Sequence, residues 1–287
     1  MLCSLLNRHK NFRTLKVRDY IQRLEHADIH NAYQESLWLI SHALGVSHSV
    51  ILSRENFSDD ECAKIESVIS RRINGEPLQY ILGEADFYGR DFHVGKGVLI
   101  PRRDTETLIE AMKFFAAHDE SFYFADWGTG SGCIAITLML EFMNSSAYMI
   151  EQSRDAITYA NHNLERYNLI HRAEIISRLE DAKHKCRFII SNPPYIPSCE
   201  INGLMKTVRD YEPLSALDGG HDGMNFYRLI ISHSLNVLTD DGYIILETGN
   251  MNQVHALESV SEDFIFVREF YDADNFPRCI VLRRRSE

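Results

Sequence analysis

The sequence has few of the residue patterns that bind zinc or form disulfides. Its six cysteines are scattered without a Cys-x-x-Cys pair, and its 13 histidines include no His-Glu-x-x-His pattern. These absences argue against a zinc site and a disulfide framework, so we expect no bound metal and reduced thiols. Reduced thiols are the usual state in the cytoplasm, where we expect the protein to act.

Long apolar runs are also absent. No stretch of about 18 apolar residues occurs, which argues against a membrane-spanning helix and a membrane partner. Residues 1–8 lack a charged leader, and their apolar run is too short for a secretory signal peptide.

Positive charge is scarce relative to negative charge. The 30 Lys and Arg residues are outnumbered by 41 Asp and Glu residues, which gives a net charge of −11 and a pI of about 5.6. General nucleic-acid binders usually carry a basic face, so we expect no stable complex with DNA or RNA. A chain of 287 residues can form one large domain or a small domain followed by a medium one.

The chain divides into three regions by pattern. Residues 1–82 have apolar positions at helical spacing, with Gly45 as a helix end and Ser58 opening a capping box. This region is predicted to be a helical domain that docks a partner. Residues 83–104 mix aromatic, β-branched and glycine residues, which predicts a β-hairpin linker. Residues 105–287 alternate strand and helix patterns, which predicts an α/β domain with a parallel sheet.

A helix is expected to begin near the start of the third region. Thr105 or Asp104 is the candidate cap for this helix. Nearby charged residues either face a cleft or only interact with the helix dipole, and both interpretations stay open. These residues are Arg102, Arg103, Asp104 and Glu106.

A glycine-rich turn follows the first predicted strand of the sheet. It occupies residues 128–132, and Glu151 stands at the end of the next predicted strand. Glycines let a backbone approach a ligand closely, and an acid at that strand end can accept both hydroxyls of a ribose. The pattern predicts a nucleoside site, although glycines alone would mark only a tight turn. No Lys-Ser/Thr pair follows, which excludes a P-loop.

An Asn-Pro-Pro-Tyr motif ends the fourth predicted strand. The two prolines lack N–H groups and favour extended backbone, so the carbonyls of Asn192 and Pro193 can face a cleft. An amide side chain, free carbonyls and an aromatic ring suit the binding of a planar N–H₂ group. The simpler alternative is a strand followed by a proline turn.

A nucleoside site and an N–H₂ site on one sheet predict group transfer onto nitrogen. S-adenosylmethionine fits as the donor because its sulfonium needs no phosphate-binding loop. No His, Lys or Cys base is evident beside the motif, so we expect catalysis mainly by positioning. The side-chain oxygen of Asn192 and the carbonyl of Pro193 would accept from the attacking N–H₂, and the ring of Tyr195 would wall the site.

The chain resembles the HemK/PrmC family, the methyltransferases that modify the glutamine of the Gly-Gly-Gln tripeptide in class I peptide chain release factors. The resemblance implies a class I, Rossmann-like α/β methyltransferase domain with seven strands, preceded by a small all-helical domain and a linking β-hairpin. It also implies N5-methylation of that glutamine in translation termination, with S-adenosylhomocysteine as the cofactor product. We expect the protein to be a monomer. The resemblance spans residues 36–282, with landmarks at 75–83, 97–102, 128–132, 191–196, 211–213 and 218–220.

The resemblance also implies roles for individual residues. Glu151 would hold the ribose, Leu179 would contact the adenine, and Asn192 would lie between cofactor and substrate. The glutamine side chain would be held by Asn192, Pro193, Pro194 and Tyr195, of which Asn192, Pro193 and Tyr195 are the expected catalytic residues. The methionine part of the cofactor would be lined by Gly128, Thr129, Gly130, Ser131 and Gly132.

The sequence departs from the family pattern in three places. Arg103 stands where the family usually has a proline, and Glu151 stands where it usually has the shorter Asp. The adenine-side motif is not clear in residues 177–181. None of these departures removes a group that the chemistry requires.

Two rival functions remain open. An amino-group methyltransferase acting on DNA or RNA shares the Asn-Pro-Pro-Tyr motif, but it needs a base-flipping pocket and a basic groove, which the charge disfavours. A nucleoside-binding docking protein without catalysis is disfavoured by the presence of Asn192 and the paired prolines. Residues 1–16 are expected to be an extension with no role.

Overall fold

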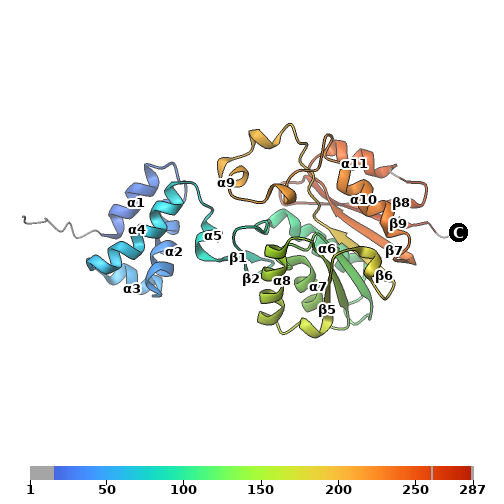
Figure 1. The fold of residues 1–287 in the computed structure, drawn as a ribbon, viewed down its shortest axis with the longest axis horizontal. Helices are drawn as coiled ribbons and strands as arrows, with labels where there is room; N and C mark the ends of the chain where they lie inside the picture. The colour runs from blue at the N-terminus through green and yellow to red at the C-terminus, as the bar shows by residue number, and fades with distance from the viewer. Residues whose placement is uncertain (1–15, 260, 286–287) are drawn as a thin grey trace, which may run out of the picture. The chain divides into compact units, whose positions relative to one another are not determined.

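A computed structural model describes residues 16–259 and 261–285, and the chain folds into two units with the boundary between Leu82 and Gly83. All but one residue of the predicted N-terminal extension, 1–16, therefore lies outside the described residues. The first unit is helical (Figure 1). Its helices are α1 Val17–Glu25, α2 Ala32–Leu44, α3 His48–Ser53, α4 Asp59–Ile73 and α5 Leu78–Leu82.

The ends of two helices in this unit follow the local signals in the sequence. Gly45 ends α2 in the left-handed conformation, with φ of 64°. Ser58 begins α4 with a capping box, in which its side chain and that of Glu61 accept from each other's backbone N–H. Helix α2 also carries Glu35, which is 9% exposed and accepts from Arg72 Nε at 2.6 Å. This ion pair joins α2 to α4 beside the apolar core of the unit.

The predicted hairpin is present at the start of the second unit. Strands β1 (Glu84–Phe87) and β2 (Arg90–His93) pair antiparallel around Tyr88 and Gly89, which both have positive φ, 54° and 68°. Positive φ at both central residues is the signature of a type I′ turn. Phe87 and Phe92 belong to one apolar cluster with sheet residue Phe124, so the hairpin packs against the sheet of this unit.

The second unit contains a seven-stranded sheet in the order β5-β4-β3-β6-β7-β9-β8, which confirms the predicted fold class. The first five of these strands are parallel, and β9 runs antiparallel to both of its neighbours. The strands are β3 Tyr123–Trp127, β4 Ser146–Ile150, β5 Ala173–Ile176, β6 Cys186–Ser191, β7 Leu238–Glu247, β8 Phe264–Tyr271 and β9 Pro277–Arg284.

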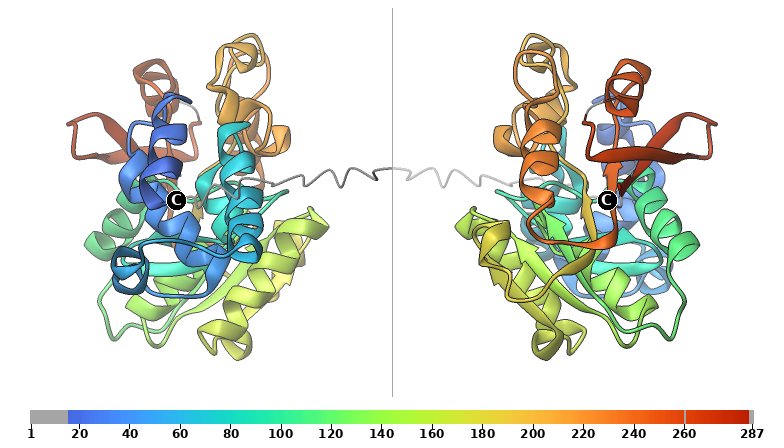
Figure 2. Two further views of the ribbon diagram at one scale, coloured as in Figure 1. Left: turned by 90° about the vertical axis from the view of Figure 1, so that its left-hand side faces the viewer. Right: turned by 90° about the vertical axis from the view of Figure 1, so that its right-hand side faces the viewer.

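Helices cover both faces of this sheet. Successive strand residues point to opposite faces, and apolar residues on each face pack against helices. Phe188 and Ile190 of β6 join a cluster with α6 Glu106–Phe115, α7 Cys133–Glu141 and α8 Arg154–Arg166. Ile189 of the same strand joins the cluster with α10 Asn225–Ser234 and α11 Met251–Glu258. Figure 2 gives two further views of the sheet and its helices. The remaining pieces are α9 Lys206–Arg209 and 3₁₀ turns at Arg103–Thr105, Ile170–Arg172, Leu179–Asp181, Ile201–Gly203 and Leu214–Ala216.

The predicted side-chain cap of α6 is wrong. The helix begins at Glu106, but Thr105 has helical φ and ψ of −64° and −19° and makes no capping bond. The Asp104 carboxylate instead pairs with Arg278 at 3.1 Å. A preceding 3₁₀ turn at Arg103–Thr105 brings the chain into the helix, so a side-chain cap is not needed there. Within the described part of the chain, no helix is long and apolar enough to cross a membrane.

Candidate active site

The turn after β3 has glycines at three alternate positions where the backbone favours them. Gly128, Gly130 and Gly132 have φ of 75°, 56° and 82°, a region that other residues rarely adopt. A Cβ on Gly132 would lie 2.9 Å from Met149 Cε, which shows close packing against β4. A Cβ on Gly128 would meet no atom within 4 Å. The turn is therefore packed on one side and open on the other.

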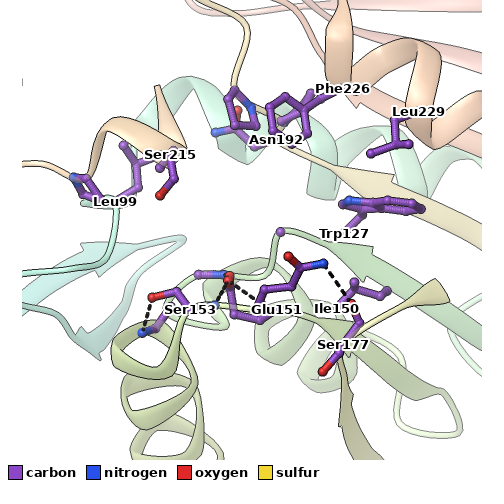
Figure 3. Close-up of a pocket in the computed structure, with 18 of the residues that line it drawn as sticks. Leu99, Trp127, Ile150, Glu151, Ser153, Ser177, Asn192, Ser215, Phe226 and Leu229 are labelled. Atoms are coloured by element: carbon purple, nitrogen blue, oxygen red, sulfur yellow. Dashed lines mark hydrogen bonds between the residues drawn. The ribbon is translucent and has the colours of Figure 1, made fainter. Parts of the chain in front are cut away.

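Glu151 lies beside this turn because β4 runs parallel to β3, with Trp127 paired to Ile150. Its Oε2 accepts from the N–H of Gly130 at 3.0 Å (Figure 3). Its Oε1 accepts from the N–H groups of Gln152 and Ser153 at 2.8 and 2.9 Å. The carboxylate is thus held in one orientation, and Oε2, which accepts from a single N–H, retains lone-pair capacity for a further donor.

The buried acid Asp126 holds the turn through hydrogen bonds. Asp126 Oδ2 accepts from the Thr129 hydroxyl at 2.5 Å and from the N–H of Ala135 at 3.2 Å. Burial raises the pKa of Asp126 to about 7. Thr129 and Ser131 are 3% and 2% exposed, so both side chains lie inside the turn.

A pocket of about 510 Å³ opens above the carboxyl ends of β3, β4 and β6 (Figure 3). Parallel α/β sheets bind ligands at this edge. The residues that the sequence predicted for the site and that line the pocket are Gly128, Gly130, Glu151, Leu179, Asn192, Pro193 and Pro194. The predicted residues that do not line it are Thr129, Ser131, Gly132 and Tyr195.

Several pocket residues were not predicted from the sequence. Trp127 lines the wall, and its ring meets His233 edge-on at a centroid distance of 6.0 Å. His233 also pairs with Glu180. Strand and helix patterns give no signal for these contacts, because they join residues far apart in the chain. Other unpredicted lining residues include Gly97, Leu99, Pro213, Ser215, Ala216, Phe226 and Leu229.

Asn192 is placed by β6, which pairs with β3 on one side and β7 on the other. Its Nδ2 donates to the Thr105 hydroxyl at 3.0 Å. Within the described residues, no donor to Asn192 Oδ1 and none to the Pro193 carbonyl is found. Since Asn192 and Pro193 both line the pocket, these two acceptors are available to a ligand there.

Tyr195 points away from the pocket, toward a buried acid. Its hydroxyl donates to Glu247 Oε1 at 3.3 Å, and burial raises the pKa of Tyr195. Its carbonyl accepts from Gln253 Nε2 at 2.8 Å. Cβ atoms on Gly219 and Gly249 would lie 2.8 Å from the Pro194 carbonyl oxygen and 2.5 Å from Tyr195 Cδ2. The motif therefore sits in a close-fitting shell of backbone and buried polar groups.

Glu247 ends β7 behind the motif and is 1% exposed. Burial raises its pKa to about 7, and the negative charge of Asp104 also acts to raise it. The Thr105 hydroxyl, the positive charge of Arg278 and the Tyr195 hydroxyl act to lower it. Glu247 is thus hydrogen-bonded to the Asn-Pro-Pro-Tyr motif through Tyr195.

Arg102 and Glu106, at the start of α6, have partners outside the pocket. Arg102 pairs with the buried Glu212, which also accepts from the N–H of Ile100 at 3.3 Å. Glu106 accepts from the N–H of Tyr88 at 3.0 Å. The Arg102–Glu212 pair joins two pocket walls, residues 97–99 and 213–216.

Comparisons with known proteins agree with this geometry. Residues 17–83 match the family model described as the PrmC N-terminal domain, and residues 103–205 match the methyltransferase small domain. A solved methyltransferase from Pyrococcus furiosus, 13% identical, shares the fold with a TM-score of 0.50 over 77% of this chain and 100% of that one.

Curated relatives cover most of the chain. The release factor glutamine methyltransferase of Geobacter sulfurreducens is 38% identical over 82% of this chain and 83% of its own. The protein of the same name from Koribacter versatilis is 32% identical over 92% of this chain and 95% of its own. The resemblance found in the sequence is thereby confirmed, and the chain belongs to the release factor glutamine methyltransferase family.

Proposed function

We propose that this protein transfers a methyl group from S-adenosylmethionine to the side-chain amide nitrogen of the glutamine in the Gly-Gly-Gln motif of class I release factors. The observation that carries the proposal is the pair of free acceptors, Asn192 Oδ1 and the Pro193 carbonyl, at the edge of a nucleoside-sized pocket. A primary amide has two N–H groups to offer them. The names of the relatives point to the same substrate.

The residues around the pocket fit S-adenosylmethionine. The pocket volume of about 510 Å³ lies within the usual range for cofactor sites. Gly128 leaves open space where a side chain would block the ligand, and Glu151 presents an oriented carboxylate to the ribose hydroxyls. Leu179 offers an apolar surface to the adenine. When bound, the cofactor would supply an electrophilic methyl carbon on its sulfonium.

The chain's own contribution to the reaction is positioning. An amide nitrogen is a weak nucleophile because its lone pair is delocalised into the carbonyl. Asn192 Oδ1 and the Pro193 carbonyl would each accept one N–H and turn the nitrogen lone pair toward the pocket. The same two oxygens would stabilise positive charge that develops on the nitrogen. Tyr195 would support the motif from behind through its bond to Glu247 rather than touch the glutamine.

The charges of the pocket favour a protein substrate over a nucleic acid. Its lining includes the acids Glu151 and Glu180, and the histidine that lines it is paired with one of them. Among the described residues that line it, Arg178 is the single Lys or Arg. Enzymes that act on DNA or RNA bases need a basic groove to hold the phosphates. We propose that the protein acts as a monomer in the cytoplasm, without a stable nucleic-acid complex.

The experiment is transfer of an isotopically labelled methyl group. Purified protein is incubated with labelled S-adenosylmethionine and a bacterial class I release factor, the same factor with Gly-Gly-Gln changed to Gly-Gly-Ala, or duplex DNA. Label is expected in the first factor alone, on its glutamine. Label in DNA, or equal label in both release factors, would contradict the proposal.

A further inference from the structure

Thr105 has a hydroxyl that its own helix does not use. A threonine in front of a helix normally accepts from a backbone N–H of the first turn. Thr105 has helical dihedral angles instead and makes no such bond. It is only 2% exposed, so water does not satisfy the hydroxyl either. A buried hydroxyl of this kind needs partners elsewhere in the structure.

The observed partner is Asn192, and the buried Glu247 carboxyl is a neighbour with an unpartnered oxygen. Thr105 Oγ1 accepts from Asn192 Nδ2 at 3.0 Å, and Glu247 Oε2 is buried without a hydrogen-bond partner among the described residues. The Thr105 hydroxyl acts to lower the pKa of Glu247, as a nearby donor does. A hydroxyl has one hydrogen, and an unprotonated carboxyl oxygen only accepts. Since Asn192 Nδ2 can only donate, the oxygen lone pair of Thr105 faces Asn192, and the hydrogen of Thr105 is left for the Glu247 carboxyl.

This direction decides which end of the Asn192 amide faces the pocket. Only the NH₂ end can lie against the lone pair of Thr105, because the carbonyl end would place two acceptors together. The carbonyl oxygen, Oδ1, is then the end left for a ligand. If the amide were turned over, the pocket would present a donor, and a substrate N–H₂ group would meet no acceptor there.

We propose that Thr105 is a positioning residue that orients the Asn192 carboxamide, with Glu247 setting the direction of its hydroxyl. The proposal deepens the proposed function and rests on it for its kinetic test. Tyr195 donates to the other oxygen of Glu247, Oε1, so this acid is also bonded to the end of the Asn-Pro-Pro-Tyr motif. The link between Thr105 and Asn192 spans 87 residues of sequence.

The kinetic test compares three variants in methyl transfer to a Gly-Gly-Gln release factor. Thr105→Val keeps the shape without the hydroxyl, and Thr105→Ser keeps the hydroxyl. Thr107→Val is the matched control, because Thr107 is a nearby threonine of α6, also largely buried, that donates to the Asp104 carbonyl. We expect kcat to fall about 10- to 100-fold in Thr105→Val, in line with the loss of a positioning contact. Thr105→Ser should recover most of that rate, Thr107→Val should keep it, and the Kd for S-adenosylhomocysteine should be unchanged in all three.

A second readout is independent of activity. The measurement is NMR of protein labelled with ¹⁵N-asparagine. The signal of the Asn192 side-chain NH₂ group is identified by its loss in Asn192→Asp. Its protons should exchange slowly with water in the wild type and much faster in Thr105→Val. If the wild type methylated no release factor, the proposed function would fail, but this signal would still decide the role of Thr105. Unchanged exchange, or a Thr105→Ser variant as slow in turnover as Thr105→Val, would overturn the inference.

Discussion

At the scale of single residues, the site depends on which polar atoms are already engaged. Asn192 has its NH₂ group committed to Thr105, which leaves its carbonyl oxygen for the pocket. Glu151 has both oxygens held by backbone N–H groups of the surrounding loops. Such preorganisation means that a ligand meets oriented acceptors and does not have to order them.

Replacing Asn192 separates cofactor binding from turnover. In Asn192→Ala the pocket keeps Glu151 and the glycine turn, but it loses one of the two acceptors for the substrate amide. We expect kcat for methyl transfer to fall at least about 100-fold, the range typical for loss of one oriented group in an active site. The Kd for S-adenosylhomocysteine, measured by calorimetry, should change by less than about threefold. Near-normal turnover would refute the role assigned to Asn192.

At the scale of elements, the Asn-Pro-Pro-Tyr motif is held by segments that come later in the chain. Gly219 approaches the Pro194 carbonyl, Gly249 approaches the ring of Tyr195, and Gln253 donates to the Tyr195 carbonyl. The prolines stiffen the motif, and these neighbours fix its position. A loop held on several sides can present its carbonyls with little loss of entropy on binding.

Gly219→Ala tests this close fit. Its φ is not positive, so alanine adds no backbone strain, but the new Cβ would lie 2.8 Å from the Pro194 oxygen and 2.8 Å from Tyr195 Cα. Because these are backbone atoms, the motif must shift, and we expect a loss of about 1–3 kcal/mol in unfolding free energy together with slower methyl transfer.

Gly203→Ala is the control for this substitution. Its Cβ would meet no atom within 4 Å, and its φ is not positive either. Turnover and urea stability of this variant should match the wild type. Equal effects of the two substitutions would show that the close contacts around the motif do not matter.

At the scale of the whole molecule, the sheet order creates the site. The chain goes from β3 to β4 and β5 on one side, then returns to place β6 on the other side of β3. The glycine turn after β3 and Asn192 after β6 therefore lie next to each other, at the point where the strand order reverses. Ligands bind open α/β sheets at such points.

Two buried acids at this edge make the stability of the fold depend on pH. Burial raises the pKa of Asp126 and Glu247 to about 7, above the range near 4 of exposed carboxyls. At a pH between about 4 and 7, the folded chain binds more protons than the unfolded chain. Each acid therefore lowers the free energy of unfolding as the pH rises, by up to about 1.4 kcal/mol per pH unit. This loss of unfolding free energy should be complete above a pH of about 8.

The measurement is urea unfolding at several pH values between 5.5 and 8.5. A Trp38→Phe background leaves Trp127 of the second unit as the fluorescent reporter. In Glu247→Gln the fall in unfolding free energy with rising pH should be smaller than in the background protein. Asp240→Asn, at a side chain that is 95% exposed, should leave the slope unchanged. A slope in Glu247→Gln as steep as in the background would contradict the raised pKa.

Local sequence patterns determined much of the secondary structure of this protein. The strands of the sheet, the Tyr88-Gly89 hairpin and the glycine turn follow from hydrophobic period and glycine position, which act over a few neighbouring residues. These signals placed Glu151 and Asn192 at the ends of strands in one sheet. The family resemblance then supplied the reaction and its substrate class.

Only the tertiary structure decided how those residues are held. The Thr105–Asn192 bond, the Arg102–Glu212 pair and the contact between Trp127 and His233 all join segments more than 80 residues apart. No local sequence pattern predicts such a contact, because its partners become neighbours only when the sheet is assembled. For the same reason the sequence did not reveal that the Tyr195 hydroxyl donates to Glu247, at the end of another strand.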